Sequence, residues 1–128
     1  MGQKTGLSDK DQQRLVHRVI DLGINLIDTS EGYGDSEKIL GRCLKGIPRD
    51  SYFIATKSRF RNQQGEIRDP LELTKAIDRS LQRLGTNHID VMQFHLLTLR
   101  DYESVVDSLY PIMDKARTEG KIQFIGFS

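Results

Sequence analysis

Four residues that can donate, accept or stabilise a proton stand at or just beyond the ends of apolar runs in this sequence. Asp28 ends INLID and Tyr33 follows it closely, Lys57 ends YFIATK, and His95 ends IDVMQFH. A carboxylate, a phenol, an amine and an imidazole are together the groups needed to tune one proton donor. If the apolar runs are parallel strands, their carboxyl ends meet at one rim and bring these side chains together.

The elements that would position these residues alternate between helix and strand. Extended, apolar segments cover 24–30, 52–57, 89–95 and 121–128, and apolar residues at helical spacing precede each of them. This alternation predicts parallel strands joined by right-handed crossovers. We therefore expect an α/β fold with about four parallel strands. A partial (β/α)8 TIM barrel would bring the four residues to one rim. A complete barrel needs about 250 residues, whereas this chain has 128.

Several helix ends are marked by residues with a known role there. Ser8 is placed to cap a first helix, and Asp69 followed by Pro70 is a strong start for a third. A last helical region covers about 102–118 and contains Pro111, which removes a backbone donor and clashes with the preceding turn. We expect a kink there, or a short helix that restarts at Pro111.

Composition and charge exclude several classes of protein. The net charge is +1 without a long run of one sign, which predicts neither nucleic-acid nor membrane binding. Cys43 is the only cysteine, so no intrachain disulfide can form, and a reducing, cytoplasmic compartment is expected. The polar N-terminus, MGQKTGLSDKD, has no apolar signal-peptide core.

Each candidate residue also has an ordinary structural interpretation. Taken singly, Asp28 could be a turn residue, Tyr33 a packing residue, Lys57 a solvated charge and His95 a structural histidine. His88 is expected in a turn at the opposite end of the strands. His17 has no partner at metal-ligand spacing, so no metal site is predicted. Cys43 falls on an apolar helix stripe and is expected in the core.

The segment SRFRNQQGEIRDP after Lys57 contains three arginines, Arg59, Arg61 and Arg68. Three arginines in an exposed loop are usually solvated, although a nucleic-acid patch is an alternative interpretation. Because the segment follows a strand that carries a candidate residue, it would lie at the same rim. There it could also help to cover a substrate.

Four blocks of the sequence together resemble the aldo-keto reductases: GINLIDTSEGYGDSEKILGRCLKG, ATK, LGTNHIDVMQFH and EGKIQFIGFS. The resemblance runs from about residue 8 to residue 128. It implies an NADP(H)-dependent oxidoreductase on a β/α barrel that reduces a small aldehyde or ketone. The family's catalytic aspartate, tyrosine, lysine and histidine match Asp28, Tyr33, Lys57 and His95.

The chemistry of these four residues fits that implied activity. Hydride addition to a carbonyl leaves an alkoxide that must receive a proton, which Tyr33 can donate. A nearby ammonium, Lys57, would stabilise the resulting phenolate, and Asp28 would hold Lys57 in place. His95 could donate a hydrogen bond to the carbonyl oxygen. The resemblance further implies that Ser128 helps to hold the nicotinamide carboxamide.

The resemblance covers only part of a family member. A glycine-rich first strand precedes the first helix in the family, and further strands that carry most cofactor contacts follow GFS. We expect residues 1–128 to form a single partial barrel domain, a fragment that carries the catalytic tetrad. The alternative is a catalytically silent half-barrel with a structural or association role. The edge strands of a half-barrel, here 24–30 and 121–128 in sequential order, would also favour self-association.

Overall fold

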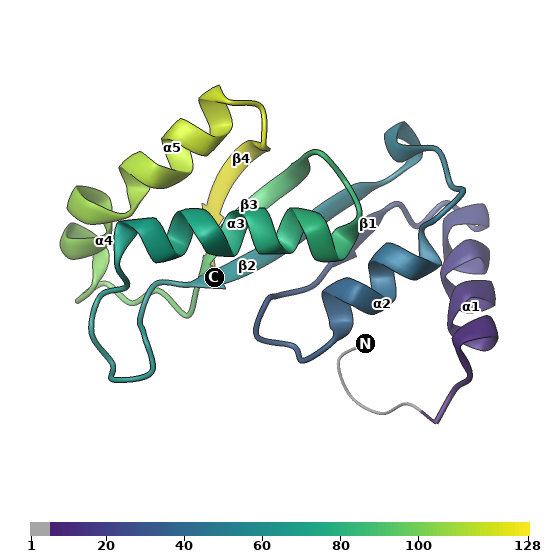
Figure 1. The fold of residues 1–128 in the computed structure, drawn as a ribbon. Coiled ribbons are helices and arrows are strands. Elements are labelled where there is room, and N and C mark those ends of the chain that lie inside the picture. The colour runs from purple at the N-terminus through teal and green to yellow at the C-terminus, as the bar shows by residue number, and fades with distance from the viewer. Residues whose placement is uncertain (1–5) are drawn as a thin grey trace.

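The computed structural model describes residues 6–128, in which helices pack against one face of a parallel four-stranded sheet (Figure 1). The polar N-terminal segment discussed above includes residues 1–5, which lie outside the described residues. In chain order the helices and strands are α1 (Asp9–Asp21), β1 (Leu26–Asp28), α2 (Ser36–Cys43), η1 (Arg49–Ser51), β2 (Phe53–Arg59), α3 (Pro70–Leu84), β3 (Ile89–His95), α4 (Tyr102–Ser108), α5 (Tyr110–Thr118) and β4 (Ile122–Phe127).

The sheet confirms the predicted strands and their sequential order. All neighbouring strands pair in parallel, in the order β1-β2-β3-β4, which is the arrangement of part of a (β/α)8 barrel. Two strand lengths differ from the prediction. Strand β1 is only three residues long. Strand β2 continues past Lys57 to Arg59, because Ser58 and Arg59 still pair with residues of β3.

The register places the ends of the strands at one rim. Asp28 of β1 pairs with Ala55 of β2, which is two residues before Lys57. Arg59, at the end of β2, pairs directly with His95 at the end of β3. Because side chains alternate between the two faces of a strand, Lys57 and Arg59 point to the same face.

The helices begin and end where local chemistry favours it. The Ser8 hydroxyl accepts from the Asp11 N–H at the start of α1. The Asp69 carboxylate accepts from the first N–H groups of α3, where Pro70 has no N–H to satisfy. The last helical region is broken, and α5 begins with Pro111 in its first turn. The predicted restart at Pro111 is therefore confirmed.

The hydrophobic core lies between the helices and the sheet. Figure 1 shows α3 crossing the sheet between α2 and α5. Cys43 is part of this core, as expected. Helices α2 and α3 approach closely, because a Cβ on Gly41 would stand only 2.3 Å from the Arg83 carbonyl oxygen. The buried Glu37 carboxylate also ties α2 to the sheet, since it accepts from the Thr56 hydroxyl at 2.7 Å.

The other face of the sheet has no helical cover among the described residues. Leu26, Phe53 and Phe124, from three different strands, are 59%, 49% and 66% exposed there. Their strands pair so that Leu26 stands opposite Phe53, and both share a face with Lys57. We call this surface the open face. Its exposed apolar residues lie at the starts of β1 and β2 and in the first half of β4, and the candidate residues lie at the other end of the strands.

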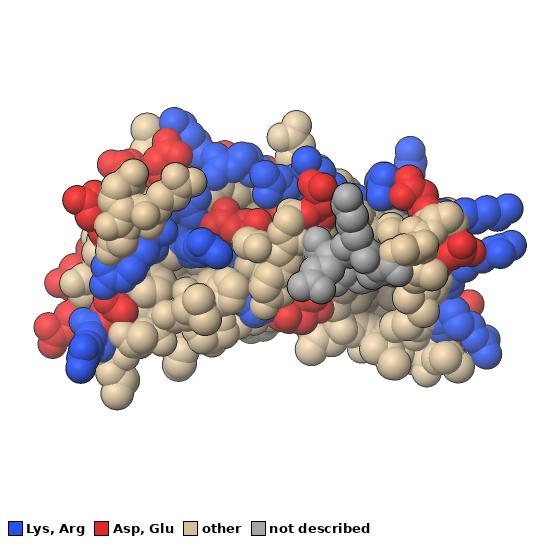
Figure 2. Space-filling view, turned by 90° about the horizontal axis from the view of Figure 1, so that it is seen from below, with Lys and Arg blue, Asp and Glu red and all other residues tan. Residues whose placement is uncertain are grey.

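On the side of the molecule that Figure 2 shows, positive and negative residues are mixed and neither sign dominates. Lys and Arg side chains lie among Asp and Glu side chains over this side of the molecule. Among residues 6–128, no helix is long and apolar enough to cross a bilayer.

Candidate active site

An ion pair at the end of the open face joins the first two strands. The Lys57 Nζ donates to the Asp28 Oδ2 at 2.5 Å and to the Thr29 carbonyl oxygen at 2.9 Å. The Lys57 side chain is only 8% exposed, whereas the Asp28 side chain is 54% exposed. The amine is therefore held in a fixed position while the carboxylate stays partly hydrated.

Tyr33 reaches this ion pair from the loop that follows β1. The Lys57 Nζ lies 5.4 Å from the centroid of the Tyr33 ring, within range of a cation–π interaction. The loop itself is a hydrogen-bonded turn, because the Tyr33 N–H donates to the Ser30 carbonyl oxygen at 3.1 Å. Tyr33 is 40% exposed, so part of the residue is accessible at this rim.

His95 completes the cluster from the end of β3. Its ring centroid lies 5.7 Å from that of Tyr33, in an edge-to-face arrangement. The next residue, Leu96, has a φ of 61° and is the only non-glycine residue with positive φ among residues 6–128. Backbone strain of this kind clusters at active sites, and here it lies directly after a candidate residue. The structure thus brings the four predicted residues together.

The environment of His95 favours its neutral form. Burial lowers the pKa of the imidazole below its usual 6.5, and the positive charges of Lys57 and Arg59 lower it further. At neutral pH the ring is therefore uncharged and carries one proton, which it can donate.

Ser30 is a site residue that the sequence argument missed. Its hydroxyl is fully buried and lies 3.2 Å from the His95 Nδ1. The same oxygen accepts from the Gly32 N–H at 3.1 Å and lies 3.3 Å from the Lys57 carbonyl oxygen. One small side chain therefore contacts all three strand ends that carry the cluster.

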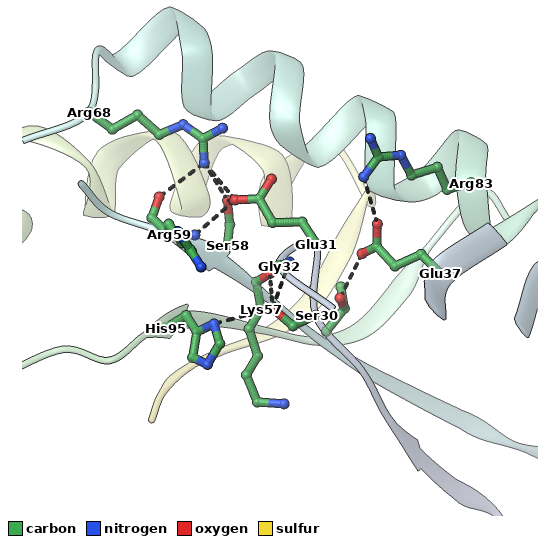
Figure 3. Close-up of polar contacts among 11 residues, drawn as sticks. Ser30, Glu31, Gly32, Glu37, Lys57, Ser58, Arg59, Arg68, Arg83 and His95 are labelled. Carbon is green, nitrogen blue, oxygen red and sulfur yellow. Dashed lines mark hydrogen bonds and ion pairs between the residues drawn. The ribbon is translucent and has the colours of Figure 1, made fainter. Parts of the chain in front are cut away.

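A second missed group lies behind the cluster, on the helix side of β2 (Figure 3). The Glu31 Oε1 accepts from the Arg68 guanidinium at 2.7 Å, the Ser58 hydroxyl at 2.7 Å and the Arg59 N–H at 2.9 Å. Glu31 and Arg68 are only 13% and 15% exposed. This cluster connects the loop that carries Tyr33 to the loop that follows Lys57.

The Glu31 carboxylate is stabilised in its charged form. Burial alone would raise its pKa, but the hydrogen bonds from Arg68, Ser58 and the Arg59 N–H outweigh burial and leave the pKa below its usual value. The expectation of a solvated arginine loop is therefore wrong for Arg68. Arg61 is exposed, as expected, and it also pairs with Asp101.

Ser128 lies at the same rim, after the end of β4. Its N–H donates to the Phe94 carbonyl oxygen at 3.0 Å, and its own carbonyl accepts from the Leu97 N–H at 2.9 Å. Ser128 is thus one strand away from His95, on the side opposite β2. Its side chain is exposed.

The remaining histidines lie elsewhere. His88 precedes β3 at the opposite end of the strands, and His17 contacts the Cys43 carbonyl oxygen through its Nε2 at 2.9 Å. Within the described part of the chain, no three His, Cys, Asp or Glu side chains are grouped so that they could hold a metal ion.

The sequence as a whole matches a known protein family. The sequence profile described as the aldo/keto reductase family matches residues 1–128. The chain belongs to the aldo-keto reductases. The predicted resemblance is therefore confirmed, and with it membership of a family of oxidoreductases that typically use NAD(P)H.

Curated relatives among the aldo-keto reductases resemble the chain over most of its length. It is 35% identical over 126 residues to the L-galactose dehydrogenase of Arabidopsis thaliana, a match that covers 95% of this chain and 39% of that protein. It is 31% identical to the NADH-specific methylglyoxal reductase of Escherichia coli K12, covering 92% of this chain and 42% of that protein. The chain thus spans about two fifths of the length of these relatives.

Solved aldo-keto reductase structures share the fold. The holo form of an aldo-keto reductase from Bacillus halodurans superposes with a TM-score of 0.80 at 30% identity, covering 94% of this chain and 42% of the other. An aldo-keto reductase from Klebsiella pneumoniae in complex with NADPH gives a TM-score of 0.73 at 26% identity, covering 99% and 42%.

The contacts of the Glu31 carboxylate should make the stability of the fold depend on pH. A carboxylate whose folded pKa is lowered stabilises the fold above its unfolded pKa of about 4.3, and this stabilisation is lost as the pH falls through the folded pKa. Glu31→Gln should therefore lower the free energy of unfolding by about 1–3 kcal/mol at pH 7. The difference from the natural chain should shrink towards pH 3. Urea unfolding at the two pH values measures it.

The matched control is Glu72→Gln, which removes an exposed ion pair with Lys75 on α3. Such a pair contributes at most about 1 kcal/mol. An equal loss of stability for Glu31→Gln at both pH values, or no loss at all, would show that the carboxylate does not act through its charge.

Proposed function

We propose that this chain is the catalytic part of an NADP(H)-dependent oxidoreductase that reduces an aldehyde or ketone to an alcohol. One observation carries the proposal. The nearly buried Lys57 ammonium contacts the Asp28 carboxylate and lies near the Tyr33 ring, and the His95 ring lies edge-to-face with Tyr33. This arrangement supplies a proton donor, a charge that stabilises its conjugate base, and a neutral hydrogen-bond donor.

Tyr33 is the proposed proton donor. A bound nicotinamide cofactor supplies the hydride, and the carbonyl oxygen of the substrate then needs a proton. The Tyr33 hydroxyl donates that proton, and the phenolate that remains is stabilised by the adjacent Lys57 ammonium. Asp28 keeps the ammonium in place by its 2.5 Å contact.

His95 is the proposed orienting residue. A neutral imidazole donates one hydrogen bond to the carbonyl oxygen without competing with Tyr33 as an acid. The lowered pKa of His95, caused first by burial, supports this role at neutral pH. Nε2 can donate to the substrate only if Nδ1 accepts, so in this proposal the single Ser30 hydroxyl proton is donated to Nδ1 rather than to the Lys57 carbonyl oxygen.

The residues present fit part of a nicotinamide site. The exposed Ser128 follows β4, next to the strand that ends in His95. There its hydroxyl could donate a hydrogen bond to the oxygen of a carboxamide. NADP(H) is proposed from the family and from the relative in complex with NADPH. The relative named as NADH-specific makes NADH the alternative cofactor.

The proposal extends to the organisation of the chain. Residues 1–128 are proposed to be a single partial barrel domain, a fragment of a longer reductase with a cytoplasmic location. A catalytically silent half-barrel is less well supported, because the relatives named above are a dehydrogenase and reductases. Small carbonyl compounds, rather than nucleic acid or membranes, are the proposed partners.

We predict that the 128-residue chain binds NADPH weakly and reduces carbonyl compounds slowly. It spans about two fifths of its relatives, so positioning of the nicotinamide would be incomplete, and positioning is a large part of rate enhancement. A fluorescence titration should give a dissociation constant well above the micromolar range. Micromolar affinity would contradict this expectation.

Where turnover is detected, Tyr33→Phe should lower its rate by at least about 100-fold, because the phenol is the proposed acid. Tyr102→Phe is the matched control, since Tyr102 is exposed on α4. NADPH absorbance follows both reactions. An undiminished rate for Tyr33→Phe would reject Tyr33 as the proton donor.

We also propose that the isolated chain associates with a second copy through its open face and edge strands. The open face exposes Leu26, Phe53 and Phe124, and the outer edges of β1 and β4 have no paired strand within residues 6–128. Exposed apolar surface and unpaired strand edges both favour association.

Sedimentation velocity tests this association. Phe124→Gln, on the open face, should raise the monomer fraction, whereas Leu71→Gln, equally apolar and exposed but on α3, should not. A natural chain that sediments as a monomer at all concentrations and melts cooperatively would contradict the proposal.

A further inference from the structure

Arg59 lies beside His95 at the rim and has no role in the reaction proposed above. It is the last residue of β2, and the register pairs it directly with His95. Alternation along the strand places its side chain on the same face as Lys57. Arg59 is therefore one step further toward solvent than the lysine, over the same end of the open face.

The backbone of Arg59 is fixed on both sides. Its N–H donates to the Glu31 carboxylate at 2.9 Å, and its carbonyl oxygen accepts from the Arg68 guanidinium at 3.0 Å (Figure 3). Glu31 and Arg68 are themselves paired and mostly buried. The side chain of Arg59 thus starts from a rigid point, although it is exposed.

The guanidinium of Arg59 packs against the loop that presents Tyr33. Its Nε and Nη2 lie 3.5 and 3.6 Å from the point where a Cβ on Gly32 would stand. Gly32 directly precedes Tyr33. The guanidinium therefore lies beside the loop that carries Tyr33, and its charge reaches His95.

Within residues 6–128, the Arg59 guanidinium forms no ion pair, and the nearby Glu31 carboxylate contacts only its backbone N–H. Three other cations of this rim are paired: Lys57 with Asp28, Arg61 with Asp101 and Arg68 with Glu31. Arg100, in the loop after β3, forms no ion pair within residues 6–128, like Arg59, but it is not paired with His95 in the strand register. Within the described chain, no ion pair or side-chain hydrogen bond involves the Arg59 guanidinium. Its positive charge still acts on His95, whose pKa it lowers together with burial and Lys57.

We propose that Arg59 binds a carboxylate on the carbonyl substrate, so that the substrates of this protein are aldehydes or ketones that carry an acidic group. The inference rests on the reductase function proposed above. A guanidinium presents two parallel N–H donors that match a carboxylate, and a pre-positioned one loses little entropy on binding.

The place of Arg59 favours the substrate over the cofactor as the source of the anion. Arg59 lies on the β2 side of His95, whereas Ser128, the proposed nicotinamide contact, lies on the β4 side. A phosphate of the cofactor shares the same chemistry, so the experiment includes it as a separate arm.

The test is an NMR titration of the isotope-labelled chain with 4-formylbenzoate and with its neutral isostere 4-formylbenzamide. The Arg59 and His95 signals should shift with 4-formylbenzoate, at about tenfold higher affinity than for the amide. Arg59→Gln should reduce the affinity for 4-formylbenzoate to that for the amide. Arg59→Lys, which keeps the charge but loses the paired donors, should give an intermediate affinity.

Arg100→Gln is the matched control, because it removes the same charge from the exposed loop after β3 at the same rim. It should leave the affinity for 4-formylbenzoate unchanged. The backbone spectrum of each variant shows whether it is folded, and if Arg59→Gln does not fold, Arg59→Lys decides the question alone.

Three results would overturn the assignment. The first is equal affinity for 4-formylbenzoate in the natural chain and in the Arg59 variants. The second is an equal loss in Arg100→Gln, which would indicate only general electrostatic attraction. The third is a shift of the Arg59 signal by inorganic phosphate and NADP⁺ but not by 4-formylbenzoate. Because the readout is binding rather than turnover, a failure here leaves the proposed reductase function standing.

Discussion

The Lys57 ammonium is the group on which the rest of the site depends. It has lost most of its hydration, and a buried charge is tolerated only where other groups replace the water. Asp28 and the Thr29 carbonyl, both from the end of β1, supply those contacts. The position of Lys57 therefore requires that β1 and β2 stay in register. The ring of Tyr33 in turn lies near the Lys57 ammonium.

Two layers of polar contacts support this arrangement from behind. Ser30 contacts the His95 Nδ1 and the backbone carbonyl of Lys57, so it couples the ends of β1, β2 and β3. The Glu31–Arg68 pair connects the loops that leave β1 and β2, and it fixes the backbone of Arg59 between them. The candidate residues at the rim are thus held in place by a supporting set of polar contacts, which is the arrangement that keeps a site geometry rigid.

The strands and three of the four candidate positions could be predicted because a local pattern determines them. Continuous apolar runs mark buried parallel strands, and Asp28, Lys57 and His95 stand where those runs end. Glu31 and Arg68 were missed because they are 37 residues apart and only the loop geometry brings them together. The sequence does place Glu31 after the first strand and Arg68 after the second, at the same rim, and their opposite charges could have indicated the pair. Arg59 was assigned to a loop because β2 continues through pairing with β3 rather than through apolar side chains.

The central claim is that the Asp28–Lys57 pair organises this end of the sheet, and a double-mutant cycle tests it most directly. Urea unfolding gives the free energies of the natural chain, Asp28→Asn, Lys57→Met and the double variant. The account predicts a coupling energy of about 1 kcal/mol or more, because Asp28→Asn should be harmful only while the Lys57 ammonium is present. Losses that add within about 0.3 kcal/mol would show that the two residues act independently and would contradict the account.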